Sequence, residues 1–216
     1  MNKISAIIFD MDGVIIDSEP VQMKAMNIAI SDCNVQIDEV EWELAAGRRT
    51  RDTIEYLIKK YNITENAESL IEKKNRIYRS LIATDIVMMP NISFVLESLK
   101  NSGYLLSIAS SSISDDIYLV LNNFSLTHYF DAIVSGDQVK NGKPAPDIFL
   151  KAIDKLNTSN ANSVVVEDTS FGVRAAKTAG IRCIAIPNKL TKNQDFSLAD
   201  LVLPEITSLL SHIKSF

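Results

Sequence analysis

The feature that most constrains this chain is an apolar run, Ile4–Phe9, that ends in the sequence Asp10-Met11-Asp12-Gly13. The run is typical of a buried parallel strand. Two carboxylates at the end of such a strand are costly unless a cation, a proton or a polar opening offsets their desolvation. Because ligands bind at the carboxyl ends of strands in open α/β sheets, we expect a site here. Asp10 and Asp12 could serve a divalent metal and a reacting group, and an Asp can itself be a nucleophile.

Apolar runs and helical patterns alternate along most of the 216 residues. Besides the first run, the expected strands cover 105–109, 132–134, 164–166, 183–186 and, with a weaker pattern, 201–203. The expected helices between them cover 92–100, 117–123, 147–156 and 172–179. This alternation predicts an α/β fold with a doubly wound, Rossmann-like parallel sheet. A hydrophobic fraction of 46% is sufficient for a substantial core.

The stretch 17–84 interrupts this alternation with helical patterns and no convincing strand. One apolar stripe consists of Ile54, Leu57, Ile58 and Tyr61. A second stripe runs from Leu70 to Leu81, with Lys74 expected at its edge. The segment is therefore predicted to be all-helical.

The interruption predicts two domains. The core consists of 1–16 and 85–216, and the helical cap is the insert 17–84, placed after the first strand. Such an insert would lie over Asp10 and could act as a lid. The alternative is a set of ordinary helices packed on one face of the sheet.

Charge and cysteine content restrict the compartment and the partners. The formal net charge is −5, and Lys and Arg form no dense stripe, so we expect no nucleic-acid partner. Cys33 and Cys183 lie far apart, which is typical of free thiols in a reduced cytoplasmic protein. The first apolar run is too short for a signal peptide, and no run is long enough to cross a membrane. We expect a cytoplasmic monomer without a membrane partner.

A second polar group follows the expected strand at 105–109. There Ser110-Ser111-Ser112 offers hydroxyls and backbone amides that can hold phosphate oxygens. Ser also caps helix N-termini, so Ser112 could instead start the next helix. Ser110, directly after the strand, is the better candidate for a ligand contact.

A lysine is held in a stiff segment further along the chain. Lys143 lies between Gly142 and Pro144, and a second proline, Pro146, precedes a helical pattern. Most lysines are simply solvated. The two prolines favour a fixed position for this one.

Acids also end the strand-like run 164–166. Glu167 and Asp168 could simply favour the N-terminus of the next helix. However, Asp10, Asp12 and Asp168 would all lie at one edge of the sheet. Carboxylates that converge in this way predict a Mg²⁺ site.

Four motifs occur in a fixed order: Asp10–Val14, Ser110, Gly142-Lys143-Pro144 and Glu167-Asp168. In this order they resemble the motifs of the haloacid dehalogenase (HAD) superfamily. The stretches Asp17–Pro20 and Lys143–Phe149 resemble its β-phosphoglucomutase-like phosphatase branch. The resemblance covers nearly the whole chain. It implies a HAD core, an inserted cap and a phosphomonoester hydrolase.

The resemblance also implies catalytic roles. Asp10 would attack phosphorus and become an aspartyl-phosphate. Asp12 would protonate the leaving oxygen and then activate water. The Mg²⁺ ion would be held by Asp10, the backbone carbonyl of Asp12, and Asp168.

The remaining motif residues would bind the phosphoryl group. Ser110 and Lys143 are the implied primary contacts, with Ser111 and Gly13 as further ones. Glu167 would either bind metal-bound water or orient Lys143.

The departures from the family pattern lie in the cap. Gln22 stands where mutases of this branch carry a His. The family's substrate loop resembles 46–52, and its arginine could be Arg48, Arg49 or Arg51. The cap residues expected to set specificity are Gln22, Gly47, Arg48, Arg49 and Lys74.

We therefore expect a Mg²⁺-dependent phosphatase that acts on a small phosphorylated metabolite, such as a sugar or polyol phosphate. Asp12 favours phosphate-ester chemistry, because related dehalogenases lack an acid there. One alternative is a sugar-phosphate mutase, whose cap must keep water away while the substrate reorients. Another is a phosphate-binding protein without turnover, which would not need Asp12.

Overall fold

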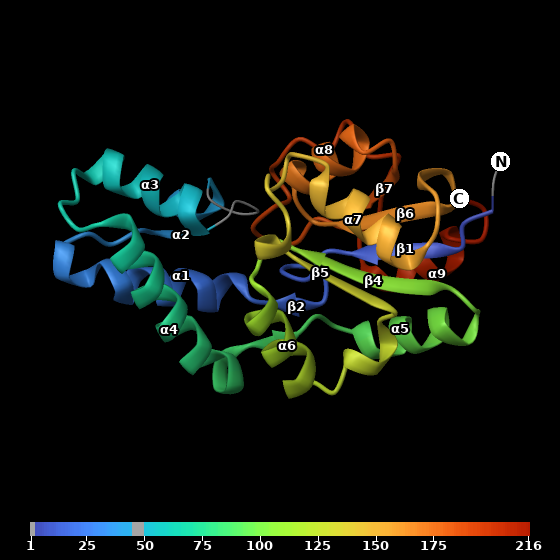
Figure 1. Cartoon of the computed structure of the whole chain (residues 1–216), viewed down its shortest axis with the longest axis horizontal. Coiled ribbons are helices and arrows are strands. Elements are labelled where there is room, and N and C mark those ends of the chain that lie inside the picture. The colour runs from blue at the N-terminus through green and yellow to red at the C-terminus, as the bar shows by residue number, and fades with distance from the viewer. Residues whose placement is uncertain (1–2, 45–49) are drawn as a thin grey trace.

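The computed structural model describes residues 3–44 and 50–216. Within these residues the main sheet has six parallel strands in the order β5-β4-β1-β6-β7-β8. They are β1 (Ala6–Phe9), β4 (Leu105–Ser110), β5 (Ala132–Ser135), β6 (Ser163–Glu167), β7 (Arg182–Ala185) and β8 (Leu201–Val202). The predicted doubly wound parallel sheet is confirmed, because each expected run supplies one of these strands (Figure 1).

Helices cover both faces of this sheet. The core helices are α5 (Ile92–Asn101), α6 (Ser114–Asn123), α7 (Asp147–Leu156), α8 (Ser170–Thr178) and α9 (Leu209–His212). In β1, Ile7 and Phe9 belong to a core cluster that includes residues of α5 and α6. Ala6 and Ile8 belong to a second cluster with α7 and α8, on the other face (Figure 1). Burial on both faces explains why the apolar runs are continuous rather than alternating.

A helical cap lies beside the core. Its described helices are α1 (Glu19–Ile30), α2 (Glu39–Glu43), α3 (Thr50–Tyr61) and α4 (Ala67–Asp85). They pack around their own apolar cluster, which includes Met26, Ile54, Leu57 and Leu70. The helices project from one end of the sheet and do not lie on its faces (Figure 1), so the predicted helical insert is confirmed.

Two side chains of the cap stripes differ from expectation. Lys74, predicted at a stripe's edge, is only 3% exposed. Its ammonium lies 4.7 Å from the centre of the Tyr78 ring, and the cavity described below supplies polar partners. Tyr61, predicted on the apolar face, is 36% exposed, and its hydroxyl donates to Glu41 Oε2 at 3.2 Å. A phenol with a polar partner near the surface does not need to join the core.

The cap and the core are joined by a two-stranded ribbon that the sequence did not reveal. β2 (Ile16–Asp17) pairs with β3 (Val87–Met88) in antiparallel register, Ile16 opposite Met88. Two-residue strands carry too few positions to show a period. The ribbon places both chain crossings side by side, as a hinge requires.

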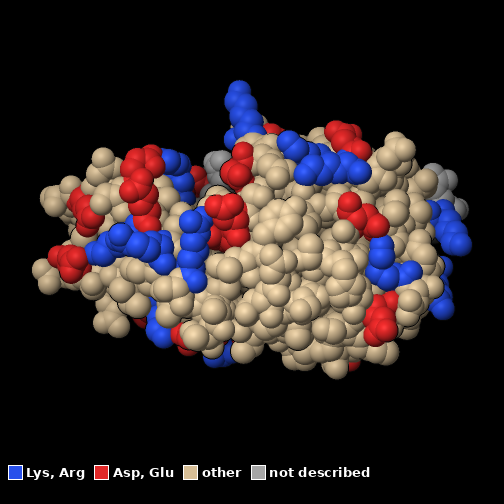
Figure 2. Space-filling view, turned by 60° about the horizontal axis from the view of Figure 1, so that its bottom comes forward, with Lys and Arg blue, Asp and Glu red and all other residues tan. Residues whose placement is uncertain are grey.

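Neither positive nor negative side chains dominate the face of the molecule that carries α4, α5 and α6. Figure 2 shows acidic and basic side chains interspersed over the cap, and few over the middle of the core on this face. The cap also carries ion pairs such as Lys73–Asp32 and Lys24–Asp85. Among the helices described, none has the length and apolar character needed to cross a bilayer.

Candidate active site

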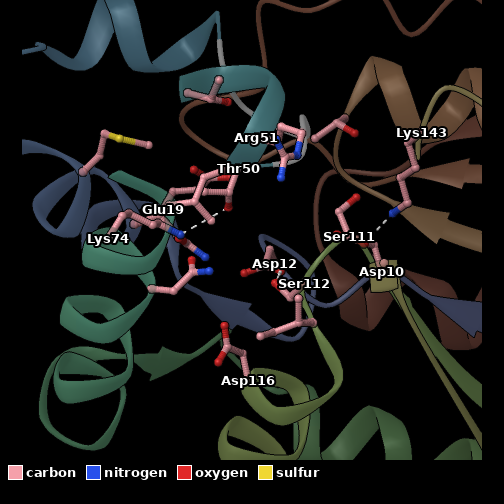
Figure 3. Close-up of a pocket in the computed structure, with 18 of the residues that line it drawn as sticks. Asp10, Asp12, Glu19, Thr50, Arg51, Lys74, Ser111, Ser112, Asp116 and Lys143 are labelled. Atoms are coloured by element: carbon pink, nitrogen blue, oxygen red, sulfur yellow. Dashed lines mark hydrogen bonds and ion pairs between the residues drawn. The ribbon is translucent and has the colours of Figure 1, made fainter. Parts of the chain in front are cut away.

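The carboxyl ends of three neighbouring strands bring the motif residues together. β1 lies between β4 and β6, so Asp10, Ser110 and Glu167 lie at the same edge of the sheet. A cavity of about 480 Å³ separates this edge from the cap. Asp10, Asp12 and Lys143 line it from the core, and cap side chains line it from the other side (Figure 3).

Lys143 is a fixed, buried cation in this cavity. Its ammonium donates to Asp10 Oδ1 at 2.5 Å and to Glu167 Oε1 at 2.6 Å. Burial alone would lower the pKa of Lys143, but the two carboxylates hold it above its usual range. A charged amine in this position can bind a phosphoryl oxygen.

The buried acids of the core have the properties of a metal site. Asp10, Glu167 and Asp168 each offer a carboxylate oxygen within 4.8 Å of the others. Burial raises the pKa of both Asp10 and Asp168, and repulsion from Glu167 raises them further. Asp168 Oδ1 is buried and has no hydrogen-bond partner. Hard oxygen ligands, more carboxylates than one lysine can neutralise, and an unpartnered oxygen together fit Mg²⁺.

Glu167 has both of its oxygens occupied. Oε2 accepts the backbone N–H groups of Asp168 and Thr169, both at 2.9 Å, and the Thr169 hydroxyl at 3.0 Å. Oε1 accepts from Lys143. A Cβ at Gly172 would lie 1.7 Å from Oε1, so the first turn of α8 needs glycine here. Both Glu167 oxygens therefore already have protein partners, and Oε1 holds the Lys143 ammonium in place.

The Asp12 side chain contacts three serine hydroxyls. Ser18 donates to Oδ1, while Ser110 and Ser112 both donate to Oδ2 at 3.1 Å. Ser110 is fully buried and also accepts the Ser112 N–H at 3.0 Å. In this arrangement Ser110 supports Asp12, and Ser111 and Ser112 are the serines that line the cavity.

Two buried ionisable groups of the cap, Glu19 and Lys74, line the cavity. The Lys74 ammonium donates to Gln22 Oε1, and lies 3.5 Å from Thr50 Oγ1. Trp42 Nε1 donates to Glu19 Oε2 at 2.6 Å. Burial raises the pKa of Glu19 to about 7 and lowers that of Lys74 to about 8. An acid and an amine that both titrate near neutral pH thus face one cavity (Figure 3).

The predicted cap loop is only partly described. Gly47, Arg48 and Arg49 lie outside the described residues. Arg51, the third candidate for the loop arginine, lines the cavity. Its guanidinium donates to Glu68 Oε1 at 2.6 Å, which ties the start of α3 to α4.

Gly13 lies beside the metal cluster. Its φ is +82°, and a Cβ there would approach Asp168 Oδ2 to 2.2 Å. The glycine is required both by this backbone conformation and by the close approach of the carboxylate. The structure thus gives Gly13 a packing role next to Asp168.

Sequence reasoning missed an acid on the core side. Asp116 lines the cavity, is 5% exposed, and accepts from Arg79 Nε of α4 at 2.5 Å. Glu19 was likewise noted only as part of a family stretch. Asp116 lies in the first helical turn after the serines that follow β4. This position in the sequence could have indicated that Asp116 lies near the site. Arg79 could not have been found, because its contact joins α4 to α6.

Comparisons with known proteins agree with this geometry. The family model described as haloacid dehalogenase-like hydrolase matches residues 7–186. A phosphorylated carbohydrates phosphatase of Thermotoga maritima is 34% identical, over 83% of this chain and 83% of its own. Beta-phosphoglucomutase of Bacillus subtilis is 31% identical, over 94% and 91%. A CbbY mutant from Rhodobacter sphaeroides, solved with xylulose-(1,5)bisphosphate, is 26% identical, over 95% and 96%, with a TM-score of 0.86.

Proposed function

Because this chain belongs to the haloacid dehalogenase-like hydrolase family, we propose that it is a Mg²⁺-dependent phosphatase of a small phosphorylated metabolite, a sugar or polyol phosphate. The phosphoryl group is carried by Asp10. The observation that carries this proposal is the buried cluster at the sheet edge, where Lys143 contacts Asp10 and Glu167 beneath a cavity. We also propose that the protein works in the cytoplasm, since Cys33 and Cys183 are both free, and as a monomer, since one chain supplies residues on both sides of the cavity.

In the first half-reaction, a carboxylate oxygen of Asp10 bonds to phosphorus while the bond to the leaving oxygen breaks. Lys143 neutralises a phosphoryl oxygen, and Ser111 and Ser112 line the space for the others. Asp12 gives its proton to the leaving oxygen.

In the second half-reaction, Asp12 takes a proton from water, and the water oxygen bonds to phosphorus. The bond between phosphorus and Asp10 breaks, which releases inorganic phosphate and restores the carboxylate. Asp10, the Asp12 carbonyl and Asp168 would hold Mg²⁺, which when bound supplies positive charge to the phosphoryl oxygens.

The cavity wall favours a substrate with several hydroxyl groups. Glu19 and Asp116 are acceptors, Lys74 is a donor, and Gln22 can be either. Polar groups of both kinds around a cavity of about 480 Å³ suit a small polyol body. The name of the Thermotoga relative, a phosphorylated carbohydrates phosphatase, supports the same class.

The likeness to beta-phosphoglucomutase favours a mutase as the second candidate. Hydrolysis is the better proposal because Gln22 accepts from Lys74 and, as an amide, cannot titrate. A His in its place could couple cap closure to proton transfer near neutral pH. Without that coupling, water should reach the aspartyl-phosphate.

A panel of phosphorylated metabolites tests the proposal. With Mg²⁺, we expect inorganic phosphate to be released from sugar or polyol phosphates, and EDTA should abolish the release. Activity that survives EDTA would contradict the metal dependence. No turnover of any compound, with phosphate still bound, would favour a binding protein.

The mutase alternative is tested with β-glucose 1-phosphate and a trace of the bisphosphate. We expect free phosphate to accumulate. Glucose 6-phosphate with negligible free phosphate would establish a mutase instead.

A further inference from the structure

The two oxygens of the Asp168 carboxylate have different surroundings. Oδ2 accepts a hydrogen bond from Asn188 Nδ2 at 2.7 Å. Oδ1 is buried and has no partner. Asn188 thus occupies one oxygen and leaves the other without a protein partner, in a carboxylate that lies in the same acidic cluster as Asp10. Use of a single carboxylate oxygen suits Mg²⁺, which is bound by few carboxylates and demands near-ideal geometry.

The orientation of the Asn188 amide is fixed by its own loop. Its Oδ1 accepts the backbone N–H groups of Leu190 at 2.9 Å and Thr191 at 3.1 Å. Only an oxygen can accept from these two donors, so the amide nitrogen must face Asp168. The Asn188 N–H in turn donates to the Thr191 hydroxyl at 3.0 Å, and Thr191 is fully buried.

The turn after β1 packs against the hydrogen bond between Asn188 and Asp168. A Cβ on Gly13 would lie 2.2 Å from Asp168 Oδ2 and 2.7 Å from Asn188 Nδ2. The glycine therefore packs against the hydrogen bond itself. The Asp168 carboxylate and the Asn188 amide fill the space that a side chain at residue 13 would need, so their hydrogen bond depends on this glycine.

The same loop also touches the cap. Leu190, two residues after Asn188, packs against the apolar cap cluster that contains Trp42, Ile54 and Leu57. Its backbone N–H is one of the two donors that fix the Asn188 amide. A continuous set of contacts therefore runs from the cap through Leu190 and Asn188 to Asp168.

We propose that Asn188 is the positioning residue of the metal ligand Asp168, and that Leu190 links this pair to the cap; this rests on the proposed Mg²⁺-dependent function. Residues that hydrogen-bond a metal ligand typically change metal affinity 10–100-fold when mutated. The loop that orients Asp168 also carries Leu190, which packs against the cap, so Mg²⁺ binding and cap position should affect each other reciprocally.

The first test measures Mg²⁺ affinity by isothermal titration calorimetry, without substrate. Asn188→Ala should weaken binding about 10–100-fold. Lys192→Ala is the matched control, because Lys192 is exposed on the same loop and its side chain makes no hydrogen bond or ion pair within the described residues. A folded Asn188→Ala variant with wild-type affinity would overturn the proposal. If it does not fold, Thr191→Val, which loosens the same loop, should give a smaller loss, and wild-type affinity would again overturn it.

The second test uses Trp42, the single tryptophan of the chain, as a reporter of the cap. Mg²⁺ should shift its fluorescence in the wild type. Leu190→Ala should still bind Mg²⁺, with its affinity changed only by the lost coupling to the cap, but should lose the shift. Leu190→Met, which conserves volume, should retain the shift. A full shift in Leu190→Ala would overturn the link to the cap.

The same measurements distinguish failure of the proposed function from failure of the inference about Asn188. A wild type that does not bind Mg²⁺, or whose binding is indifferent to Asp10→Asn, would remove the metal site itself. Normal Mg²⁺ binding that depends on Asp10 but not on Asn188 would remove only this inference.

Discussion

At the scale of single residues, the carboxylates differ in whether they keep a free oxygen. Glu167 has none, Asp168 has one, and Asp12 is surrounded by hydroxyls that a substrate oxygen or water could replace. In the proposed mechanism these surroundings suit three different roles: Glu167 would orient Lys143, Asp168 would hold the metal, and Asp12 would transfer protons. Each role can be removed separately by replacing that carboxylate with the corresponding amide, Asp→Asn or Glu→Gln.

Asp12→Asn should separate the two half-reactions. With p-nitrophenyl phosphate, whose leaving group needs little protonation, transfer to Asp10 should continue. Hydrolysis of the intermediate should slow by about 10²–10⁴-fold, because the base is lost. Stopped-flow absorbance should show a burst of about one equivalent of p-nitrophenol, then a slow phase. Asp115→Asn, whose side chain is 83% exposed, is the control; a wild-type steady rate in Asp12→Asn would show that another group is the base.

Glu19 gives a pH-dependent prediction. Its pKa is raised from 4.5 to about 7, chiefly by burial. A raised folded-state pKa means that the stability it provides is present below pH 4.5 and is lost as pH rises through about 7. Glu19→Gln removes this titration and can still accept from Trp42. In urea unfolding, the variant should gain on the order of 3 kcal/mol relative to the wild type between these pH values; a pH-independent difference would contradict the shift.

Residues at strand ends could be predicted from the sequence, and their partners could not. Asp10, Lys143 and Glu167 were found because each follows or interrupts a recognisable element. Asn188 follows the apolar run 183–186 in the same way, so its position was a usable signal. The hydrogen bond from Trp42 to Glu19 could not be predicted, because it depends on how two cap helices pack.

At the scale of elements, the chain enters and leaves the cap through the ribbon of β2 and β3, so we expect this ribbon to act as the hinge of the cap. Arg79 lies six residues before the end of α4, so about 9 Å along the helix from that end. Its pair with Asp116 is therefore close to the hinge. Leu190 contacts the cap cluster from the loop after β7. Rotation about the ribbon should disturb the Leu190 contact more than the pair near the pivot.

We expect the cap to close over a bound phosphate analogue. Closure excludes water during transfer, yet the substrate must enter. Crystals grown with and without Mg²⁺ and a metal fluoride should differ in the angle between α1–α4 and the main sheet. One rigid closed arrangement in both crystals, without an entry path, would refute the lid.

Periodicity predicted several of the longer elements and failed for α2, β2 and β3. The stripes of α3 and α4 were visible because each helix spans three or more turns. α2 has five residues and β2 and β3 have two each, which is too short for a pattern. These short elements depend on tertiary contacts, such as the pairing of Ile16 with Met88.

At the scale of the whole molecule, the strand order creates the site. The chain starts at the centre of the sheet, adds β4 and β5 on one side, then β6 to β8 on the other. Asp10 and Glu167, which are far apart in sequence, thereby meet at neighbouring strand ends. The alternation of elements predicted this class of fold, whereas the register between strands came only from the structure.

The most direct test of the central claim is the rate of phosphate release by Asp10→Asn on the best substrate, with saturating Mg²⁺. The amide keeps the shape of the side chain but is a poor nucleophile. We predict a fall of at least about 10³-fold, with thermal unfolding showing an intact fold. Release at close to the wild-type rate would contradict covalent catalysis by Asp10.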